Sequence, residues 1–160
     1  AAESGTHVSF DLNGRTSQWA TPDAYRQALK NILRHCDLIF AGTDDLAVAG
    51  IDPTPAGILE LLPSNHSAIV FITDGPAETT ALTVDDGEIT EQMTATPPSA
   101  TAATTAGAGD AFAGAVLAAQ DDGISNLDEL ATIGNAAGAA AVATIGPFDA
   151  DGSGPTDDLF

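Results

Sequence analysis

Residues 104–114 read TTAGAGDAFAG, which places two glycines and a carboxylate at the start of a run of helix-forming residues. A helix amino-terminus presents unpaired backbone N–H groups and about half a positive charge. Glycines there allow a phosphate to approach the backbone closely, so Gly107, Ala108 and Gly109 are predicted to form an anion cradle. Asp110 would repel that phosphate unless it acts as a base, taking a proton from a hydroxyl while the N–H groups hold charge on a transferring phosphoryl group.

The same stretch can also be interpreted as having a purely structural role. Residues 107–109 then form a tight loop, and Asp110 is a first-turn residue that the helix dipole favours. Short glycine-rich loops are weak signals by themselves. The residue types alone therefore leave both interpretations open.

Alternating strands and helices precede this stretch. The continuous apolar run AIVFIT at 68–73 is typical of a parallel strand covered on both faces. Thr21 and Pro22 begin a helix whose apolar stripe is Tyr25, Leu29, Ile32 and Leu33. Strands are predicted at 7–13, 37–42 and 68–73, helices at 21–36, 43–50, 54–63, 108–120 and 125–143, and a hairpin at 80–93 with its turn at Asp86 and Gly87. This order predicts an α/β fold with a mostly parallel sheet flanked by helices, in a single domain over residues 1–160.

The charge balance excludes several partners. The chain has 23 acidic and 4 basic residues, for a net charge of −19, so neither nucleic acid nor an anionic membrane surface is an expected partner. Hydrophobic residues make up 44% of the chain, which argues against disorder. Cys36 is the only cysteine, which fits a reducing cytoplasm, and His7, His35 and His66 lack a metal-ligand spacing. The scarcity of lysine resembles proteins of salt-loving archaea.

TTAGAGDAFAGAVLAA resembles the second signature of the ribokinase-like (PfkB) carbohydrate kinases, D-T-x-G-A-G-D-x-F-x-x-G. The matching residues are Thr105, Gly107, Ala108, Gly109, Asp110, Phe112 and Gly114. VSFDLNGRTSQW is similar to the D-x-N-x-R…W segment of fructokinases and 2-keto-3-deoxygluconate kinases. Three later stretches resemble further segments of the family, in the family's order: DLIFAGTDDLAVAG, AIVFITDGPAE and GNAAGAAAVATIG. The resemblance therefore runs from about residue 7 to residue 147.

The resemblance implies an ATP-dependent phosphorylation of a sugar or sugar-acid hydroxyl, such as that of 2-keto-3-deoxygluconate or fructose, with ATP and Mg²⁺ as cofactors. Asp110 is the implied catalytic base, and Gly107, Ala108 and Gly109 form the implied anion hole for the γ-phosphate. The remaining implied nucleotide contacts are Thr105 in the signature, Thr73 and Gly75 near the ribose and phosphates, and Asn135 near the adenine.

Three residues after the first predicted strand are candidates for substrate or phosphate binding. Asp11 and Asn13 lie at a strand end, where α/β proteins commonly bind ligands, and their alternative role is to cap a turn. Arg15 would contact a phosphate or an acidic sugar, and its alternative is a surface ion pair.

The chain departs from the family pattern at several positions. Thr104 replaces the leading Asp of the signature, which puts the usual monovalent-cation loop in doubt. Gly42 and Asp45 stand where the family has the Asn and Glu of N-x-x-E, so Asp45 is a weakened candidate for the magnesium shell. Glu78 replaces a glycine of T-x-G-x-x-G. These departures leave open a nucleotide-binding or interaction module without kinase activity, as a degenerate or truncated copy, and a kinase acting on a nucleoside or vitamin.

The sequence begins at a segment that corresponds to the middle of the family fold. The family's sugar-binding residues and lid strands lie in its amino-terminal half, so the chain is expected to be the nucleotide-binding carboxyl-terminal half of a sugar kinase. An exposed sheet edge is expected where the first strands are missing, to be covered by a separate amino-terminal half or by self-association into a homo-oligomer. The chain alone is not expected to phosphorylate a sugar.

The charge balance predicts a response to salt. With a net charge of −19, the melting temperature should rise from low to molar KCl, because salt screens the repulsion between acidic groups. Circular dichroism melts across a KCl series measure this. A flat or falling melting temperature would contradict the halophilic interpretation.

Overall fold

The computed structural model describes residues 6–101 and 103–143, and the carboxyl-terminal end of the family resemblance, residues 144–147, lies outside them. The chain divides into two units, which are described separately below. The first comprises Ala1–Gly75 and Thr80–Met93, and the second comprises Pro76–Thr79 and Thr94–Phe160. A single domain over residues 1–160 stays a prediction.

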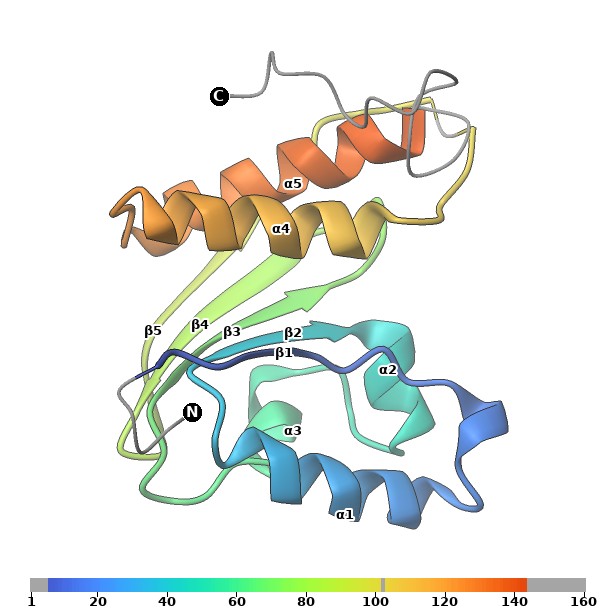
Figure 1. Cartoon of the computed structure of the whole chain (residues 1–160), viewed down its shortest axis with the longest axis vertical. Helices are drawn as coiled ribbons and strands as arrows, with labels where there is room; N and C mark the ends of the chain where they lie inside the picture. The colour runs from blue at the N-terminus through green and yellow to red at the C-terminus, as the bar shows by residue number, and fades with distance from the viewer. Residues whose placement is uncertain (1–5, 102, 144–160) are drawn as a thin grey trace. The chain divides into compact units, whose positions relative to one another are not determined.

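The sheet confirms the predicted strands. Its strands follow the order β1 (Ser9–Asp11), β2 (Leu38–Gly42), β3 (Ala68–Thr73), β4 (Thr79–Asp85) and β5 (Glu88–Ala95), as Figure 1 shows. β1 pairs in parallel with β2, and β2 in parallel with β3, with Asp11 opposite Phe40 and Gly42 opposite Thr73. The carboxyl ends of these three strands therefore lie at one edge of the sheet. β4 runs antiparallel to β3, which makes the sheet mixed.

The predicted hairpin is confirmed at β4 and β5. Asp86 and Gly87 connect the two strands with φ values of 51° and 77°. Positive φ at both central residues is the geometry of a two-residue turn whose twist matches that of the strands. Gly87 is also required sterically, because a Cβ atom there would lie 2.2 Å from the carbonyl oxygen of Ser64.

The predicted helices of the first unit are confirmed with shorter bounds: α1 spans Pro22–Leu33, α2 spans Thr43–Val48 and α3 spans Pro55–Leu59, with a short 3₁₀ turn at Thr16–Gln18 before them. The Thr21 hydroxyl accepts a hydrogen bond from the Ala24 N–H at 3.1 Å, as expected for an N-cap. The predicted helix extended to residue 36, but the His35 and Cys36 N–H groups bond three residues back and close a tighter turn after Leu33.

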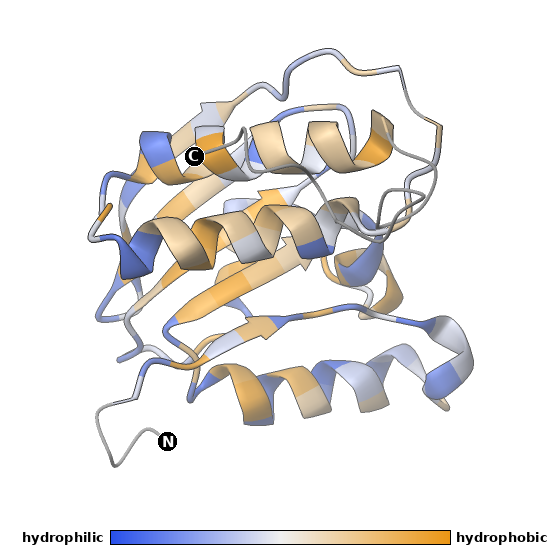
Figure 2. Ribbon diagram, turned by 45° about the horizontal axis from the view of Figure 1, so that its top comes forward, coloured by the Kyte–Doolittle hydropathy of each residue, from blue (hydrophilic) through white to orange (hydrophobic). Residues whose placement is uncertain are grey.

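The core of the first unit lies between the sheet and these helices. Its buried side chains include Leu29, Leu33, Ile39, Leu46, Ile58, Val70 and Leu82. Figure 2 shows the apolar character of the central strands. The predicted stripe of α1 holds for Tyr25, Leu29 and Leu33, whereas Ile32 is 40% exposed because it falls beside the line of residues spaced four apart.

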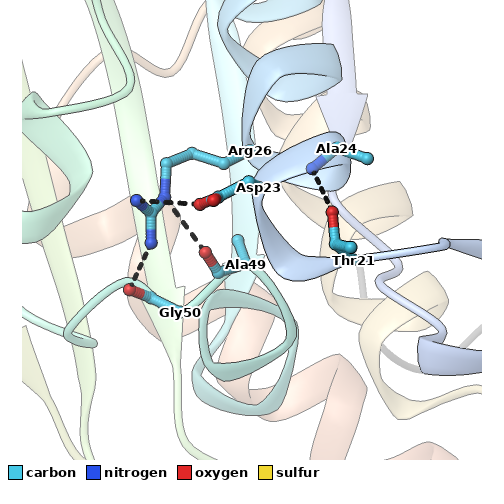
Figure 3. A network of polar contacts seen from close by, with 6 residues as sticks. All are labelled: Thr21, Asp23, Ala24, Arg26, Ala49 and Gly50. Carbon is cyan, nitrogen blue, oxygen red and sulfur yellow. Dashed lines mark hydrogen bonds and ion pairs between the residues drawn. The ribbon is translucent and has the colours of Figure 1, made fainter.

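Arg26 joins α1 to the end of α2 (Figure 3). Its Nε atom donates to the Ala49 carbonyl at 3.1 Å, and its Nη2 atom donates to the Gly50 carbonyl at 2.8 Å. An ion pair of 3.5 Å with Asp23 accompanies these bonds. A cation at a helix carboxyl end is favourable, and these contacts commit Arg26 to the fold.

The second unit contains α4 (Ala108–Asp121) and α5 (Leu127–Ala143), which pack against each other and confirm both predicted helices. Gly134 permits this packing, because a Cβ atom there would lie 2.6 Å from the Phe112 ring. Asn135 of α5 is buried: its Oδ1 atom accepts from the Thr79 hydroxyl at 2.7 Å, and its Nδ2 atom donates to the Ala95 carbonyl at 3.1 Å. Across the described ranges, the helices lack the length and apolar character needed to cross a membrane.

Tyr25 is a buried residue with a polar end. Its hydroxyl donates to the Leu12 carbonyl at 2.8 Å, and its ring lies 4.8 Å from that of Trp19. Burial, followed by the negative charges of Asp45 and Asp11, raises the pKa of Tyr25 to about 12. The folded state therefore favours the protonated phenol.

This shift predicts a loss of stability in alkali. The contribution of Tyr25 to the free energy of unfolding is fully present below its unfolded pKa of 10.0 and is lost as the pH rises toward about 12. The loss should be on the order of 1–3 kcal/mol, measured by urea unfolding at constant KCl. Tyr25→Phe should remove this step. Tyr25 is the only tyrosine, so a tyrosinate absorbance midpoint near pH 10 in the folded protein would contradict the prediction.

Candidate active site

The amino end of α4 carries unpaired backbone donors. Gly107 is its N-cap in the left-handed conformation, with φ of 83° and ψ of −3°. The Ala111 N–H makes the first intrahelical bond, to the Gly107 carbonyl at 2.9 Å. The preceding N–H groups of Ala108, Gly109 and Asp110 have no hydrogen-bond acceptor among the described residues. The Gly107 N–H likewise has no acceptor among these residues, so the cradle of Gly107, Ala108 and Gly109 stays a prediction.

Three other helices have a side chain that accepts from one of their first N–H groups, whereas α2, like α4, has a glycine N-cap without one. Thr21 caps α1, and the Thr54 hydroxyl accepts from the Gly57 N–H of α3 at 3.1 Å. Asn126 accepts from the Glu129 N–H of α5 at 2.9 Å. α4 has no such side chain, because its N-cap is Gly107. The unpaired donors and the dipole of this 14-residue helix suit a bound anion.

Asp110 lies in the first turn of α4 and is exposed. Within the part of the chain that the structure describes, its carboxylate has neither a hydrogen bond nor an ion pair. A free, accessible carboxylate beside unpaired N–H groups can accept a proton from a ligand held there.

Thr105 and Thr104 lie just before this helix. Thr105 is exposed, whereas the Thr104 hydroxyl accepts from the Ala106 N–H at 3.1 Å. The residue that replaces the family's acidic residue is thus engaged in a local turn.

Gly109 has no structural reason to be glycine. A Cβ atom there would meet nothing within 4 Å, and its backbone is helical. Glycine within a helix costs about 0.5–1 kcal/mol relative to alanine. In Gly134 the same cost is offset by packing, but in Gly109 it is not. The open space above Gly109 fits a ligand that approaches the helix end closely.

A second group of candidate residues lies at the carboxyl edge of the parallel strands. The Asp11 Oδ1 atom accepts from the Asn13 N–H at 3.1 Å, and Asn13 has φ of 39°. This is the turn-capping geometry given above as the alternative for both residues. Their role in ligand binding stays a prediction. Arg15 follows in the same loop and is exposed.

Asp45 connects the loops after two strands. Its Oδ1 atom accepts from the Gly14 N–H at 2.6 Å, and its Oδ2 atom accepts from the Gly42 N–H at 3.1 Å. Sequence reasoning missed Gly14, although its place directly after the D-x-N segment was a usable signal. In the described residues there is no group of three or more His, Cys, Asp or Glu that could hold a metal ion. Asp45 as a magnesium residue stays a prediction.

Thr73 and Gly75 lie at the end of β3. The Thr43 hydroxyl donates to the Asp74 carboxylate at 2.9 Å, which joins this end to the start of α2. Gly75 has φ of 53° and open space around its Cα. Thr73 and Gly75 thus belong to the first unit, whereas Thr105, Asp110 and Asn135 belong to the second.

Comparisons with known proteins agree with this fold. Residues 1–150 match the family described as pfkB family carbohydrate kinase. Over 115 residues the chain is 33% identical to a fructokinase of Klebsiella pneumoniae, covering 71% of this chain and 36% of the fructokinase. A crystal structure from E. coli, assigned as ribokinase II, has a TM-score of 0.73 and 25% identity, covering 96% of this chain and 46% of that one.

A second E. coli structure with the same assignment, in complex with ATP and Mg²⁺, has a TM-score of 0.72 and 26% identity. It aligns with 94% of this chain and 46% of its own length. The chain therefore spans between about a third and a half of the relatives that it matches. The family match over 150 residues, together with the parallel strands and the GAGD helix start, shows that the chain belongs to the pfkB family of carbohydrate kinases.

Proposed function

We propose that this chain supplies the ATP-binding and catalytic-base part of a kinase that phosphorylates a hydroxyl of a sugar or sugar acid, such as fructose or 2-keto-3-deoxygluconate. The amino end of α4 carries the proposal: unpaired N–H groups, the open Gly109 and the exposed Asp110 follow one another in the chain. The chain is similar to a fructokinase and to a protein assigned as ribokinase II that was crystallised with ATP and Mg²⁺. Both similarities support the transfer of a phosphoryl group to a sugar hydroxyl.

In this reaction, the N–H groups of Gly107, Ala108 and Gly109 hold the γ-phosphoryl oxygens, where negative charge develops. Asp110 takes the proton from the sugar hydroxyl as its oxygen bonds to the γ-phosphorus. The bond from that phosphorus to the bridging oxygen breaks, and ADP leaves with the bridging electron pair. Exposed N–H groups fit a phosphate, and Mg²⁺ would supply further neutralisation of the phosphate charge when bound.

The remaining roles are assigned by the family resemblance. Thr73, Gly75 and Thr105 contact the ribose and phosphates. The Asn135 Nδ2 atom donates one hydrogen to the Ala95 carbonyl, and its second hydrogen is the proposed donor to the adenine. The family position of Asp45 makes it a weak candidate for Mg²⁺, and Arg15 binds an anionic group. A cytoplasmic location and a halophilic source remain predictions from composition. So does a partner, either a separate amino-terminal half or a second copy of the chain.

A nucleotide-binding or interaction module without kinase activity is the second candidate, and Thr104, Gly42 and Glu78 at family positions favour it. ATP binding without phosphorylation of any sugar by the complete enzyme would support this module. The absence of ATP binding at high salt would leave only the interaction role.

Asp110→Asn separates catalysis from binding. In the complete enzyme, turnover should fall by at least about 10²–10⁴-fold, because a general base contributes that much. ATP affinity should be kept or increased, because the change removes a negative charge and leaves the N–H groups in place. Steady-state kinetics and ATP titration measure the two effects.

Asp121→Asn is the matched control for this variant. Asp121 is an exposed carboxylate at the opposite end of the same helix, so the charge change is identical. Its turnover should equal that of the unmodified enzyme. Unchanged turnover in Asp110→Asn would remove Asp110 from the role of base.

Gly109→Ala should stabilise the chain and weaken its binding of ATP. Alanine fills open space in a helix and should raise the free energy of unfolding by about 0.5–1 kcal/mol, while its methyl group obstructs the phosphate. Gly109→Val, with a larger side chain, should weaken ATP binding further. Gly114→Ala is the control, since Gly114 also has open space around it but lies in the middle of α4, away from the amino end, and the change should affect stability alone. Equal ATP affinity in all three variants would contradict a cradle at Gly109.

A further inference from the structure

Asp45 joins two segments that are far apart in the sequence. One carboxylate oxygen accepts from Gly42, at the start of its own helix, and the other accepts from Gly14, 31 residues earlier. Gly42 ends β2 and Gly14 follows β1, and these strands are parallel neighbours. A single side chain therefore connects the loops that leave the same edge of the sheet.

The loop after β1 is held at further points. A Cβ atom at Gly14 would lie 3.0 Å from the ring and hydroxyl of Tyr25 and 3.2 Å from the Asp45 Cα, so only glycine fits there without a shift. The Tyr25 hydroxyl bonds the Leu12 carbonyl, and its ring packs on Trp19. The backbone on both sides of Arg15 is thereby fixed.

Among the described residues, the guanidinium of Arg15 has no protein partner. Of the four basic residues in a chain of net charge −19, Arg26 is bonded to the end of α2. Arg15 is exposed, and its guanidinium makes neither a hydrogen bond nor an ion pair within the described part of the chain. A cation on a fixed loop, left unpaired in so acidic a chain, is suited to an anion from outside the protein.

We propose that Asp45 is a positioning residue: its carboxylate holds the loop after β1 against the start of α2 and thereby fixes Arg15 for an anionic group of the substrate. This inference rests on the proposed function. The anionic group is either a phosphate of the nucleotide or the carboxylate of a sugar acid, which share the same planar recognition by arginine.

A double-mutant cycle tests this proposal. Dissociation constants for ATP without Mg²⁺, for 2-keto-3-deoxygluconate and for fructose are measured by calorimetry on the complete enzyme, unmodified and carrying Arg15→Gln, Asp45→Asn or both. Arg15→Gln should raise the dissociation constant of one of the two anionic ligands about 10–100-fold, which is the range of a charge-assisted hydrogen bond. Asp45→Asn should weaken the same anion by about tenfold, because the amide can accept from only one of the two N–H groups. The double variant should be no weaker than Arg15→Gln alone. Fructose, which has no carboxylate, should not respond.

Two further variants make the result specific. Asp44→Asn is the matched control, since Asp44 is an exposed carboxylate in the same first turn, and it should not change anion binding. Gly42→Ala keeps every charge but places a Cβ atom 2.8 Å from the Asp45 Oδ2 atom, so it should weaken the same anion. It serves as the second test if Asp45→Asn unfolds, and emission from Trp19, the only tryptophan, reports whether the loop stays folded.

The proposal is overturned by additive effects of Asp45→Asn and Arg15→Gln, by a lack of response to Arg15→Gln in both anion arms, or by an effect of Asp45→Asn that appears only when Mg²⁺ is added. The last result would assign Asp45 to the metal instead. Failure of the unmodified enzyme to bind ATP in the same titrations would count against the proposed function, and so is separate from these outcomes.

Discussion

Every helix begins with backbone N–H groups that lack partners inside the helix, and much of this structure follows from how they are satisfied. Thr21, Thr54 and Asn126 supply side-chain oxygens at the starts of α1, α3 and α5. The start of α4 has none, because its N-cap is a glycine in the left-handed conformation. Backbone donors that have no protein partner cost little free energy at an exposed helix end, because water or a ligand can accept hydrogen bonds from them there. At the proposed catalytic site, we expect water or a ligand to accept hydrogen bonds from these N–H groups.

Two departures from the family pattern are physically coupled. Asp45 is one methylene shorter than the Glu found in the family pattern, and its carboxylate folds back onto the Gly42 N–H. A Cβ atom at residue 42 would lie 2.8 Å from that carboxylate, so the Asn of the family pattern would displace it. The small residue at 42 and the short acid at 45 therefore suit each other. They mark a local rearrangement in which the carboxylate reaches Gly14 as well.

One of the few basic residues, Arg26, also bonds backbone groups at a helix end. Arg26 bonds two carbonyls at the end of α2, where the helix dipole is negative. That arrangement uses one of four basic residues to hold the helices of the first unit together. A net charge of −19 then leaves many acidic groups without a cation, which is the reason that we expect salt to stabilise the fold.

The sequence by itself determined the elements and the chemistry of the α4 start. Local rules were sufficient there: the capping Thr21 and Thr54, the Asp86–Gly87 turn and the apolar run at 68–73 each depend on neighbours within a few residues. The GAGD stretch was equally local, because the unpaired donors and the carboxylate lie within one helical turn.

Tertiary structure decided the contacts between distant residues. Asp45 was expected to serve magnesium, and only the parallel pairing of β1 and β2 brings Gly14 within 2.6 Å of it. The buried bonds of Asn135 to Thr79 and Ala95 span 56 and 40 residues, beyond the reach of any local pattern. Packing also decided which glycines are structural: Phe112 lies against Gly134, whereas nothing lies against Gly109. Hydrogen bonds and contacts of this kind depend on which segments meet in space, and spacing along the chain does not contain that information.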